Sequence, residues 1–501
     1  MGAMFFSLSP TDSWDFARLS GDFNPLHVDP VAARRLQFGS TVCHGVHQAL
    51  KALDLAVAAA LLVPTKIAAI SAVFSGSLHS DCLAEVQPVL DGKGLLAKLT
   101  VGAGGRSLFT VRLTLADGLP QVANPSAADP ELPHPPKCVD FPQQTEAAAL
   151  AGSVPLRLNE ALACRLFPSL AAAPQGLALM VDMLATTRVI GMECPGLHSI
   201  YSELKLRRLG EEGLARAQPP GTPLGMAYAV QHCDPRFRSV RIGVVGKSLG
   251  GTLNAFFRAP PVNQIPLKEL FALVGPDRFT GQKALVVGGS RGLGELVAKI
   301  LLAGGAQVTL TYAQGKADAE RIQQEARSAG CSAQILQMDA SAVADTSLQA
   351  SLANTGFTHL YHFATPQITR NVSGTWSDSL FEGFCKLYLR AFANLVRVVA
   401  PEKKQLPPLV ALYPSTVFLD QPPKGFAEYC AAKAAGEALC EHLELSHKVR
   451  IHKPRLPRLQ TDQNGSFLGV EGESPFPVML AHLASMHPER PSLDEPPQEP
   501  A

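Results

Sequence analysis

The pattern of apolar and polar residues changes along this chain and indicates two regions of different fold. In residues 1–118 the apolar run VHQALKALDLAVAAALL predicts a buried helix just after Gly45. Segments of alternating character follow and predict antiparallel strands: IAAISAVFSG, LAEVQPVL, LLAKLTVGAG and SLFTVRLTLA. This order suits a sheet that wraps around one helix. From residue 283 onward, short β-branched runs such as KALVV alternate with helical segments, which indicates a doubly wound parallel sheet.

The helix-then-strands order occurs again after Ala151, which indicates an internal duplication. The expected equivalences are Gly152-Ser153 with Gly21-Asp22, Pro155-Leu156-Arg157 with Pro25-Leu26-His27, and Gln175-Gly176 with His44-Gly45. Arginine stays protonated and cannot act as a base, so the second copy is predicted to be catalytically degenerate. Proline-rich linkers set the expected domains at residues 1–125, 126–265 and 266–488, with a disordered tail at 489–501.

Composition narrows the class of protein. The 501 residues are 46% hydrophobic with a net charge of +1 and no basic block, so neither nucleic acid nor a membrane surface is an expected partner. The ten cysteines include no C-x-x-C pair, so we expect free thiols and no metal site. No signal sequence and no apolar run of spanning length is recognised, and a cytoplasmic location is expected.

The stretch SGDFNPLHVDPVAARRLQFGSTVCHG (20–45) carries the first candidate site. Asp22 and His27 are too far apart to be i,i+4 partners, and Asn24-Pro25 between them favours an irregular loop that aims both side chains at one volume. An acid and an imidazole together can position and deprotonate a water molecule. The Gly45 N–H, near a helix N-terminus, is suited to a developing oxyanion.

This stretch resembles the MaoC-like family of (R)-specific enoyl-thioester hydratases and dehydratases, through SGD-x-NP-x-H-x-D, then FG, then HG. The resemblance covers residues 10–120 or so and implies a hotdog fold; with the duplication, it implies a double hotdog. It also implies that Asp22 and His27 are the catalytic pair and that the Gly45 N–H holds the thioester carbonyl. Taken singly, Asp22 could be a helix-capping acid and His27 a surface histidine. The second lobe is expected to cover the long helix and shape the acyl tunnel.

The motif GGSRGLG carries the second candidate site. Its glycines follow a strand and open a helix, so the backbone can approach a pyrophosphate at the helix N-terminus. Together with Ser415 and Tyr429-x-x-x-Lys433, it resembles the short-chain dehydrogenase/reductase family over residues 279–465 or so, with a Rossmann-type α/β fold. The resemblance implies these cofactor-binding residues: Gly288, Ser290, Arg291, Gly292, Leu293, Gly294, Asp339, Ala364, Tyr429 and Lys433.

The same resemblance implies roles for three catalytic residues. Tyr429 would be the general acid, Lys433 would lower the Tyr429 pKa and hold the ribose, and Ser415 would orient the carbonyl. Asp339 would contact the adenine. The chain departs from the family in three places: His362-Phe363-Ala364-Thr365 follows the fourth strand, FCKLYLRAF lacks the tetrad asparagine, and no seventh strand is found. Ser415 lies one residue further from Tyr429 than is common, so Thr416 could take its role.

NADP(H) is the expected cofactor. The second strand ends Thr311-Tyr312-Ala313-Gln314 without the acid that NAD-preferring sites place on the ribose, and Arg291 or Lys316 could pair with a 2′-phosphate. The leading hypothesis is a bifunctional enzyme on 2-enoyl, (R)-3-hydroxyacyl and 3-oxoacyl thioesters of CoA or acyl-carrier protein. In the alternatives, the reductase-like domain acts on an unrelated substrate such as a nucleotide sugar, only binds nucleotide, or docks a carrier protein. The resemblance also allows a homo-oligomer.

Overall fold

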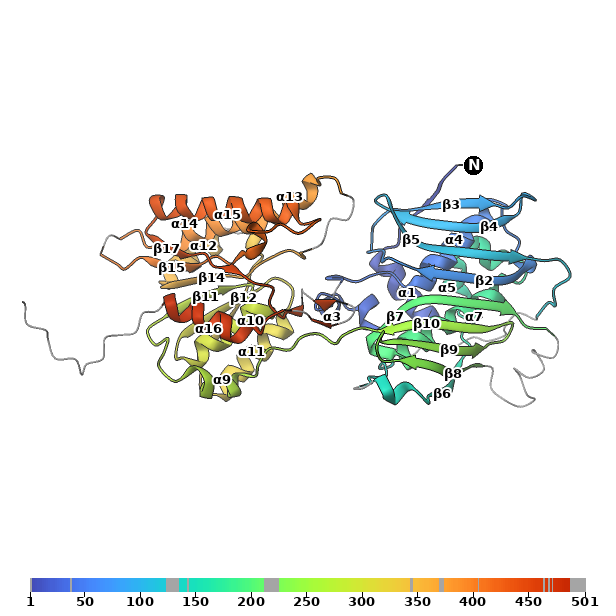
Figure 1. The fold of residues 1–501 in the computed structure, drawn as a ribbon, viewed down its shortest axis with the longest axis horizontal. Helices are drawn as coiled ribbons and strands as arrows, with labels where there is room; N and C mark the ends of the chain where they lie inside the picture. The colour runs from blue at the N-terminus through green and yellow to red at the C-terminus, as the bar shows by residue number, and fades with distance from the viewer. Residues whose placement is uncertain are drawn as a thin grey trace, which may run out of the picture. The chain divides into compact units, whose positions relative to one another are not determined.

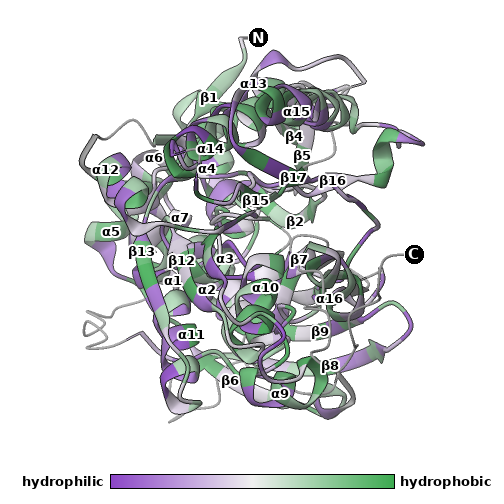
Figure 2. Cartoon of the chain, turned by 90° about the vertical axis from the view of Figure 1, so that its left-hand side faces the viewer, coloured by the Kyte–Doolittle hydropathy of each residue, from purple (hydrophilic) through white to green (hydrophobic). Residues whose placement is uncertain are grey.

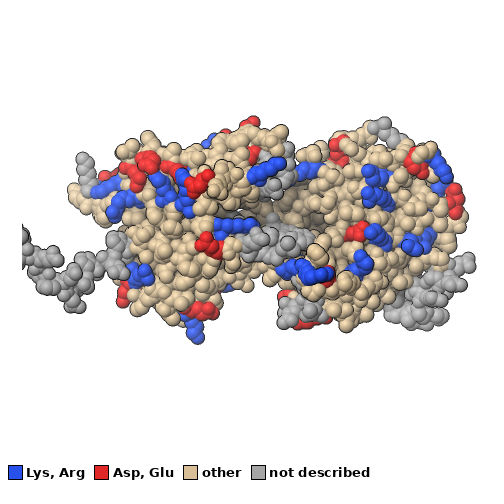
Figure 3. Space-filling view, viewed as in Figure 1, with Lys and Arg blue, Asp and Glu red and all other residues tan. Residues whose placement is uncertain are grey.

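The computed structural model describes residues 2–36, 38–122, 135–141, 144–210, 225–342, 346–368, 374–403, 405–462, 465–466, 469–470 and 472–486. The tail predicted at 489–501 lies outside these residues. The chain forms two compact units, one of Met1–Pro260 with Ser466–Gly469 and one of Pro261–Gly465 with Val470–Ala501. No helix in the described part of the chain is both long and apolar enough to cross a membrane. Acidic and basic side chains are interspersed over the visible face of each unit (Figure 3).

The first unit is built on one ten-stranded sheet with the order β1-β3-β4-β5-β2-β7-β10-β9-β8-β6 (Figure 1). The first five strands in this order are β1 (Met4–Phe6), β3 (Ala84–Leu90), β4 (Leu96–Ala103), β5 (Arg106–Leu115) and β2 (Ile67–Phe74). The others are β7 (Ser199–Arg208), β10 (Leu249–Phe257), β9 (Ser239–Val245), β8 (Gly225–Asp234) and β6 (Ala151–Pro155). The two halves have mirrored strand orders, as a duplication requires.

Each half of the sheet packs on its own central helix, α4 (Gly45–Ala58) or α7 (Gly176–Arg188). The halves join where β2 pairs antiparallel with β7, with Ile70 opposite Leu206. One continuous apolar core contains residues of both helices, among them Leu50 and Leu184. The predicted double hotdog is therefore confirmed, and its two lobes are parts of one unit.

The structure corrects one part of the internal alignment. Gln175-Gly176 and His44-Gly45 both lead into a central helix, as predicted. Ser153, however, lies in edge strand β6, the counterpart of β1, whereas Asp22 follows helix α1 (Pro10–Ser20). The counterpart of α1 is α5 (Glu160–Leu166). Ser153 and Arg157 therefore do not occupy the positions of Asp22 and His27. The predicted alignment rested on a match of only a few residues, and it was shifted by one structural element.

The second unit contains a six-stranded parallel sheet with the order β13-β12-β11-β14-β15-β17. These strands are β13 (Ala333–Gln337), β12 (Gln307–Tyr312), β11 (Lys283–Val287), β14 (His359–His362), β15 (Leu409–Leu412) and β17 (Val449–His452). This is the doubly wound order, which reverses beside β11. The predicted Rossmann-type sheet is confirmed, and no seventh strand of it occurs among the described residues.

Helices cover both faces of this sheet (Figure 1). One core includes residues of α9 (Leu267–Val274), α10 (Gly292–Ala303), α11 (Lys316–Ser328) and α16 (Pro475–Met486). The other includes residues of α12 (Thr346–Thr355), α13 (Asp378–Cys385), α14 (Phe392–Val399) and α15 (Ala427–Ser446). The α11 helix shows why: it buries Ala319, Ile322 and Ala326, three and four residues apart, and its other residues are largely hydrophilic (Figure 2).

Candidate functional site

The acid of the first site lies at a turn and its histidine on a short helix. α1 ends at Gly21, whose φ of +78° is a conformation that glycine adopts readily. His27 lies in α2 (Pro25–Val28), which Asn24 caps by accepting a hydrogen bond from the Leu26 N–H. The prediction of an irregular loop is therefore wrong for His27. Pro25 occupies the first turn of the helix, where proline is tolerated.

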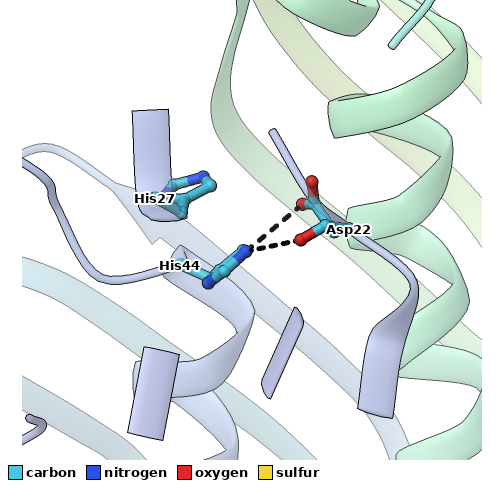
Figure 4. A group of neighbouring side chains, drawn as sticks. All are labelled: Asp22, His27 and His44. Atoms are coloured by element: carbon cyan, nitrogen blue, oxygen red, sulfur yellow. Dashed lines mark hydrogen bonds and ion pairs between the residues drawn. The ribbon is translucent and has the colours of Figure 1, made fainter. Parts of the chain in front are cut away.

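The two predicted catalytic side chains meet within the first unit, where Asp22 is buried and His27 is half-buried. Asp22 is 1% exposed, and its carboxylate accepts hydrogen bonds from the Asn24 N–H (3.1 Å) and the Thr187 hydroxyl (2.7 Å). His27 Nδ1 lies 2.7 Å from the Val42 carbonyl, so this nitrogen carries the proton and Nε2 is left as an acceptor. Candidate ligand atoms of Asp22, His27 and His44 lie within 4.8 Å of one another (Figure 4).

His44 is a residue of this site that the sequence analysis did not assign. Its Nε2 donates a 3.0 Å hydrogen bond to the Asp22 carbonyl and lies 3.9 Å from the Asp22 carboxylate. Its ring stacks on that of His27, with centroids 3.8 Å apart and planes at 27°. The HG dipeptide is the signal in the sequence that marks this histidine. Burial holds the pKa of His44 well below its ordinary value, so this imidazole is neutral.

Burial moves the pKa values of the dyad toward each other. It raises the pKa of Asp22, against the opposing effects of the His27 charge and of the hydrogen bonds from Thr187 and Asn24. It lowers the pKa of His27, against the opposing charge of Asp22. A carboxylate that binds a proton more readily and an imidazole that releases one more readily can exchange that proton at small free-energy cost. The pair has the chemistry of an acid–base dyad.

The second lobe completes this site. The Asn24 side-chain amide donates to the carbonyls of Gly191 (3.1 Å) and Gly196 (3.0 Å). Gly191 lies just beyond α7, and a Cβ at this position would be 2.2 Å from the Asp22 carboxylate. The second lobe therefore supplies both the Thr187 hydrogen bond and the close wall over Asp22, neither of which the sequence predicted.

Gly45 lies where the sequence analysis placed it, at the start of the central helix. It is the first residue of α4, with His44 as the N-cap, and the first amides of an α-helix have no intrahelical acceptor. A Cβ at Gly45 would lie 3.1 Å from the Phe74 ring, so a larger residue would have to displace that ring. The helix dipole and the orphan amide favour a negatively charged oxygen at this position.

The glycine loop of the second unit has the geometry that a dinucleotide requires. Gly288 and Gly292 have φ values of +74° and +57°. A Cβ at Gly288 would lie 2.8 Å from the Ala364 N atom, and a Cβ at Gly294 would lie 2.2 Å from the Gly288 carbonyl. The loop is held by the Gly288 N–H, which donates to the Thr311 hydroxyl. These residues fit a nicotinamide dinucleotide, whose phosphates would lie at the N-terminus of α10.

The other predicted cofactor residues lie around this loop and beside the next strands. Ser290 is buried in the loop, and Leu293 is in the first turn of α10. Ala364 follows β14. The Asp339 carboxylate follows β13 and accepts hydrogen bonds from the Ser341 N–H and hydroxyl, which lower its pKa. All four flank the ends of parallel strands, where such folds bind nucleotides.

The two cations expected to select NADP(H) both have carboxylate partners. Arg291 forms a 2.8 Å ion pair with Asp462, and Lys316 lies 3.5 Å from Glu320 on the exposed surface of α11. As the sequence indicated, no acidic residue lies at the end of β12. The strand ends at Tyr312, and Ala313 and Gln314 follow it. A 2′-phosphate that used Arg291 would therefore compete with Asp462 for the guanidinium.

Tyr429 meets Thr416 and not Ser415, which corrects the assignment of Ser415. Both hydroxyl residues form the short strand β16 (Ser415–Thr416), and neighbouring residues of a strand face opposite sides. The Ser415 hydroxyl donates to the Glu437 carboxylate on α15. The Tyr429 hydroxyl is hydrogen bonded to the Thr416 side chain, an interaction that lowers the Tyr429 pKa. The hydroxyl that can orient a carbonyl beside Tyr429 is therefore that of Thr416.

Lys433 lies one turn after Tyr429 on α15, and its Nζ donates a 2.6 Å hydrogen bond to the Pro414 carbonyl. Burial lowers the pKa of Lys433 to about 7. Burial also raises the pKa of Tyr429 to about 12. That direction is opposite to the lowering expected from Lys433, because desolvation of the phenolate outweighs the effects that stabilise it.

Comparison with known proteins agrees with both resemblances. The family model of the MaoC like domain matches residues 6–79, and that of the short chain dehydrogenase matches residues 282–464. A short-chain dehydrogenase/reductase of Pestalotiopsis microspora is 41% identical over 71 residues, which are 14% of this chain and 27% of that protein. This chain thus spans about a quarter of that curated relative.

Solved structures of short-chain dehydrogenases match this chain over most of their own length. One from Burkholderia cenocepacia J2315, in complex with NADP, is 20% identical over 43% of this chain and 94% of its own, with a TM-score of 0.37. A putative one from Pseudomonas syringae is 21% identical over 43% and 93%, with a TM-score of 0.37. The chain is a fusion of two enzyme-type domains. It carries a MaoC-like domain at its N-terminus and a short-chain dehydrogenase domain at its C-terminus.

Proposed function

We propose that this chain is a bifunctional enzyme that interconverts 2-enoyl, (R)-3-hydroxyacyl and 3-oxoacyl thioesters of CoA or acyl-carrier protein. The observation that carries the proposal is that each unit holds acid–base groups together at its own site. These groups are the buried Asp22 with the half-buried His27, and the buried Tyr429 with Thr416 and Lys433. The two reactions share the (R)-3-hydroxyacyl thioester, which is a chemical reason for one chain to carry both.

In the first unit, water adds to C3 of the 2-enoyl thioester. Asp22 and His27 take a proton from that water and deliver a proton to C2, and the reverse transfers accompany dehydration. Negative charge develops on the thioester oxygen during the addition. The Gly45 N–H, at the positive end of α4, would donate to that oxygen. His44 and Thr187 hold the Asp22 loop and carboxylate in place.

In the second unit, NADP(H) bound at the glycine loop would supply or accept the hydride. Tyr429 gives its phenolic proton to the oxygen of the 3-oxo group as that oxygen becomes a hydroxyl, and Thr416 donates a hydrogen bond to the same oxygen. Lys433, when charged, favours release of the Tyr429 proton. The missing acid after β12 supports NADP(H) over NAD(H), with Arg291 and Lys316 as candidate partners of the 2′-phosphate.

One incubation tests the whole proposal. The full chain is mixed with a short 3-oxoacyl-CoA and NADPH, and the thioesters are identified by mass spectrometry. We expect both the (R)-3-hydroxyacyl and the 2-enoyl product, the first alone in Asp22→Asn and neither in Tyr429→Phe. Hydration of 2-enoyl-CoA with no oxidation of bound NADPH would replace the proposal with a hydratase fused to a nucleotide-binding module. Turnover of a different carbonyl, such as that of a nucleotide sugar, would support the unrelated-substrate alternative.

A further inference from the structure

Two aromatic rings enclose the Lys433 ammonium group in the second unit. Its Nζ lies 3.8 Å from the centroid of the Tyr388 ring and 4.9 Å from that of Tyr413. Lys433 is 6% exposed, so these contacts are made away from water. The carboxylate of Glu437, one turn further along α15, binds Arg455 and Ser415. The cation is therefore held by ring faces and by the Pro414 carbonyl.

Tyr388 connects this cation to the rest of the site. It lies in η6 (Lys386–Ala391), a π-helical segment, and such segments are frequent at functional sites. Its hydroxyl shares a 2.5 Å hydrogen bond with the Thr365 hydroxyl in the segment that follows β14. Its ring meets the Tyr429 ring edge-on, with centroids 6.0 Å apart. One side chain thus touches the lysine, the general-acid tyrosine and the altered segment His362-Phe363-Ala364-Thr365.

We propose that Tyr388 is a positioning residue of the reductase site: its ring keeps Lys433 protonated beside Tyr429, and its hydroxyl fixes the ring to Thr365. Tyr388 lies in the stretch FCKLYLRAF, where the sequence shows no tetrad asparagine. The proposal deepens the reductase function proposed above and rests on it for the consequence in catalysis. The contact itself depends only on the geometry, so it can be tested even if the substrate is different.

The Tyr388 ring matters because the protonated and neutral forms of Lys433 are close in free energy near neutral pH. Burial lowers the Lys433 pKa to about 7, so modest interactions decide whether it is charged near neutrality. A ring face attracts a desolvated ammonium group. The groups that act on Lys433 are the Pro414 carbonyl, Tyr388 and Tyr413 from packed elements, Glu437 and Cys440 on its own helix, and His362 on β14. Without the Tyr388 ring, the charged form loses one of its few stabilising contacts.

The test is the pKa of Lys433 in the full chain without substrate. The protein is labelled with limiting acetic anhydride between about pH 5 and pH 10, and the Lys433 peptide is quantified by mass spectrometry. Tyr388→Leu should move the labelling midpoint down by about one pH unit, the shift that a desolvated cation–π contact corresponds to. Tyr388→Phe keeps the ring and should leave the midpoint in place. An unchanged midpoint in Tyr388→Leu would overturn the proposal.

A matched control separates the cation contact from aromatic packing. Phe384 also stacks against Tyr388 (5.7 Å) and meets Tyr429 (5.5 Å), so Phe384→Leu removes a buried ring beside both. It should leave the Lys433 midpoint unchanged, and an equal shift in both leucine variants would overturn the proposal. If Tyr388→Leu does not fold, as judged by circular dichroism, Tyr388→Met is the replacement because its flexible side chain fills irregular space.

A second measurement connects the contact to catalysis. If wild type oxidises NADPH with a 3-oxoacyl-CoA, the rate should fall as Lys433 loses its proton, and this basic limb should move to lower pH in Tyr388→Leu by the same amount as the labelling midpoint. A limb that stays in place while the midpoint moves would overturn the positioning role. If wild type does not oxidise NADPH, the proposed function fails, while the labelling still decides whether Tyr388 holds the cation.

Discussion

The Thr187 hydroxyl donates a 2.7 Å hydrogen bond to the Asp22 carboxylate, across 165 residues of sequence. Thr187 lies near the end of α7, the central helix of the second lobe. The predicted catalytic acid of the first lobe is therefore oriented by the second lobe. A single hotdog lobe cut from this chain would lack that bond, which gives a physical reason for the chain to keep both lobes.

Removal of this bond should change the pH dependence of hydration. The Thr187 hydrogen bond lowers the Asp22 pKa, against the raising effect of burial. In Thr187→Val the pKa of Asp22 should rise further, by about one unit for a bond to a charged group. Activity that needs the ionised Asp22 would then be lost at a higher pH as the solution is acidified. Hydration of 2-enoyl-CoA against pH measures the shift, with Thr187→Ser as the control that keeps the bond.

The dyad itself should be indispensable for hydration. Asp22→Asn and His27→Ala should each lower hydratase turnover by about a hundredfold or more, the usual contribution of acid–base groups. Arg157→Ala, in the second lobe, should leave the chemical step unchanged. Turnover of crotonyl-CoA, followed by loss of the enoyl absorbance, measures all three. Full activity in both dyad variants would contradict the site.

Position 191, which lies against the Asp22 carboxylate, should tolerate no side chain larger than that of glycine. A methyl group there would lie 2.2 Å from the carboxylate, so Gly191→Ala must displace either the Asp22 side chain or the segment after α7. We expect a loss of hydratase turnover of at least about tenfold, since small misplacements of reacting groups have large effects on rate. NADPH binding should be unchanged, because Gly191 belongs to the other unit. Gly210→Ala is a comparison within the same unit, where a Cβ would meet nothing within 4 Å.

The cofactor preference should respond to Asp462. This carboxylate pairs with Arg291 in the glycine loop at 2.8 Å. If Arg291 binds the 2′-phosphate, Asp462→Asn should remove a competing carboxylate and tighten NADPH binding by about fivefold, or about 1 kcal/mol, with NADH binding little changed. Fluorescence titration with both cofactors measures this. Tighter binding of NADH than of NADPH by wild type would contradict the NADP(H) assignment.

Site residues that belong to one local motif could be predicted from the sequence, whereas contacts between residues far apart in the sequence could not. Asp22 and His27 lie within one stretch, so the loop between them predicted a common volume, and the family resemblance added Gly45 to that site. The glycine loop was equally local. Thr187 and Gly191 could not be found in this way, because their contact with Asp22 depends on how two lobes pack. Similarly, Ser415 and Thr416 are adjacent in sequence, and only the direction of each side chain in β16 determines which one meets Tyr429.

That distinction yields the last prediction, a pair of matched variants in the reductase domain. Thr416→Ala removes the hydroxyl beside Tyr429 and should lower NADPH-dependent reduction on the order of a hundredfold, as loss of one oriented donor does in other sites. Ser415→Ala removes a hydrogen bond to Glu437, which Arg455 still binds, and should lower the free energy of unfolding by about 1 kcal/mol with little effect on turnover. Initial rates with a short 3-oxoacyl-CoA, together with urea unfolding of each variant, separate the two effects. The reverse result, with Ser415→Ala inactive and Thr416→Ala active, would restore Ser415 as the catalytic hydroxyl and show that β16 turns its other face to the substrate.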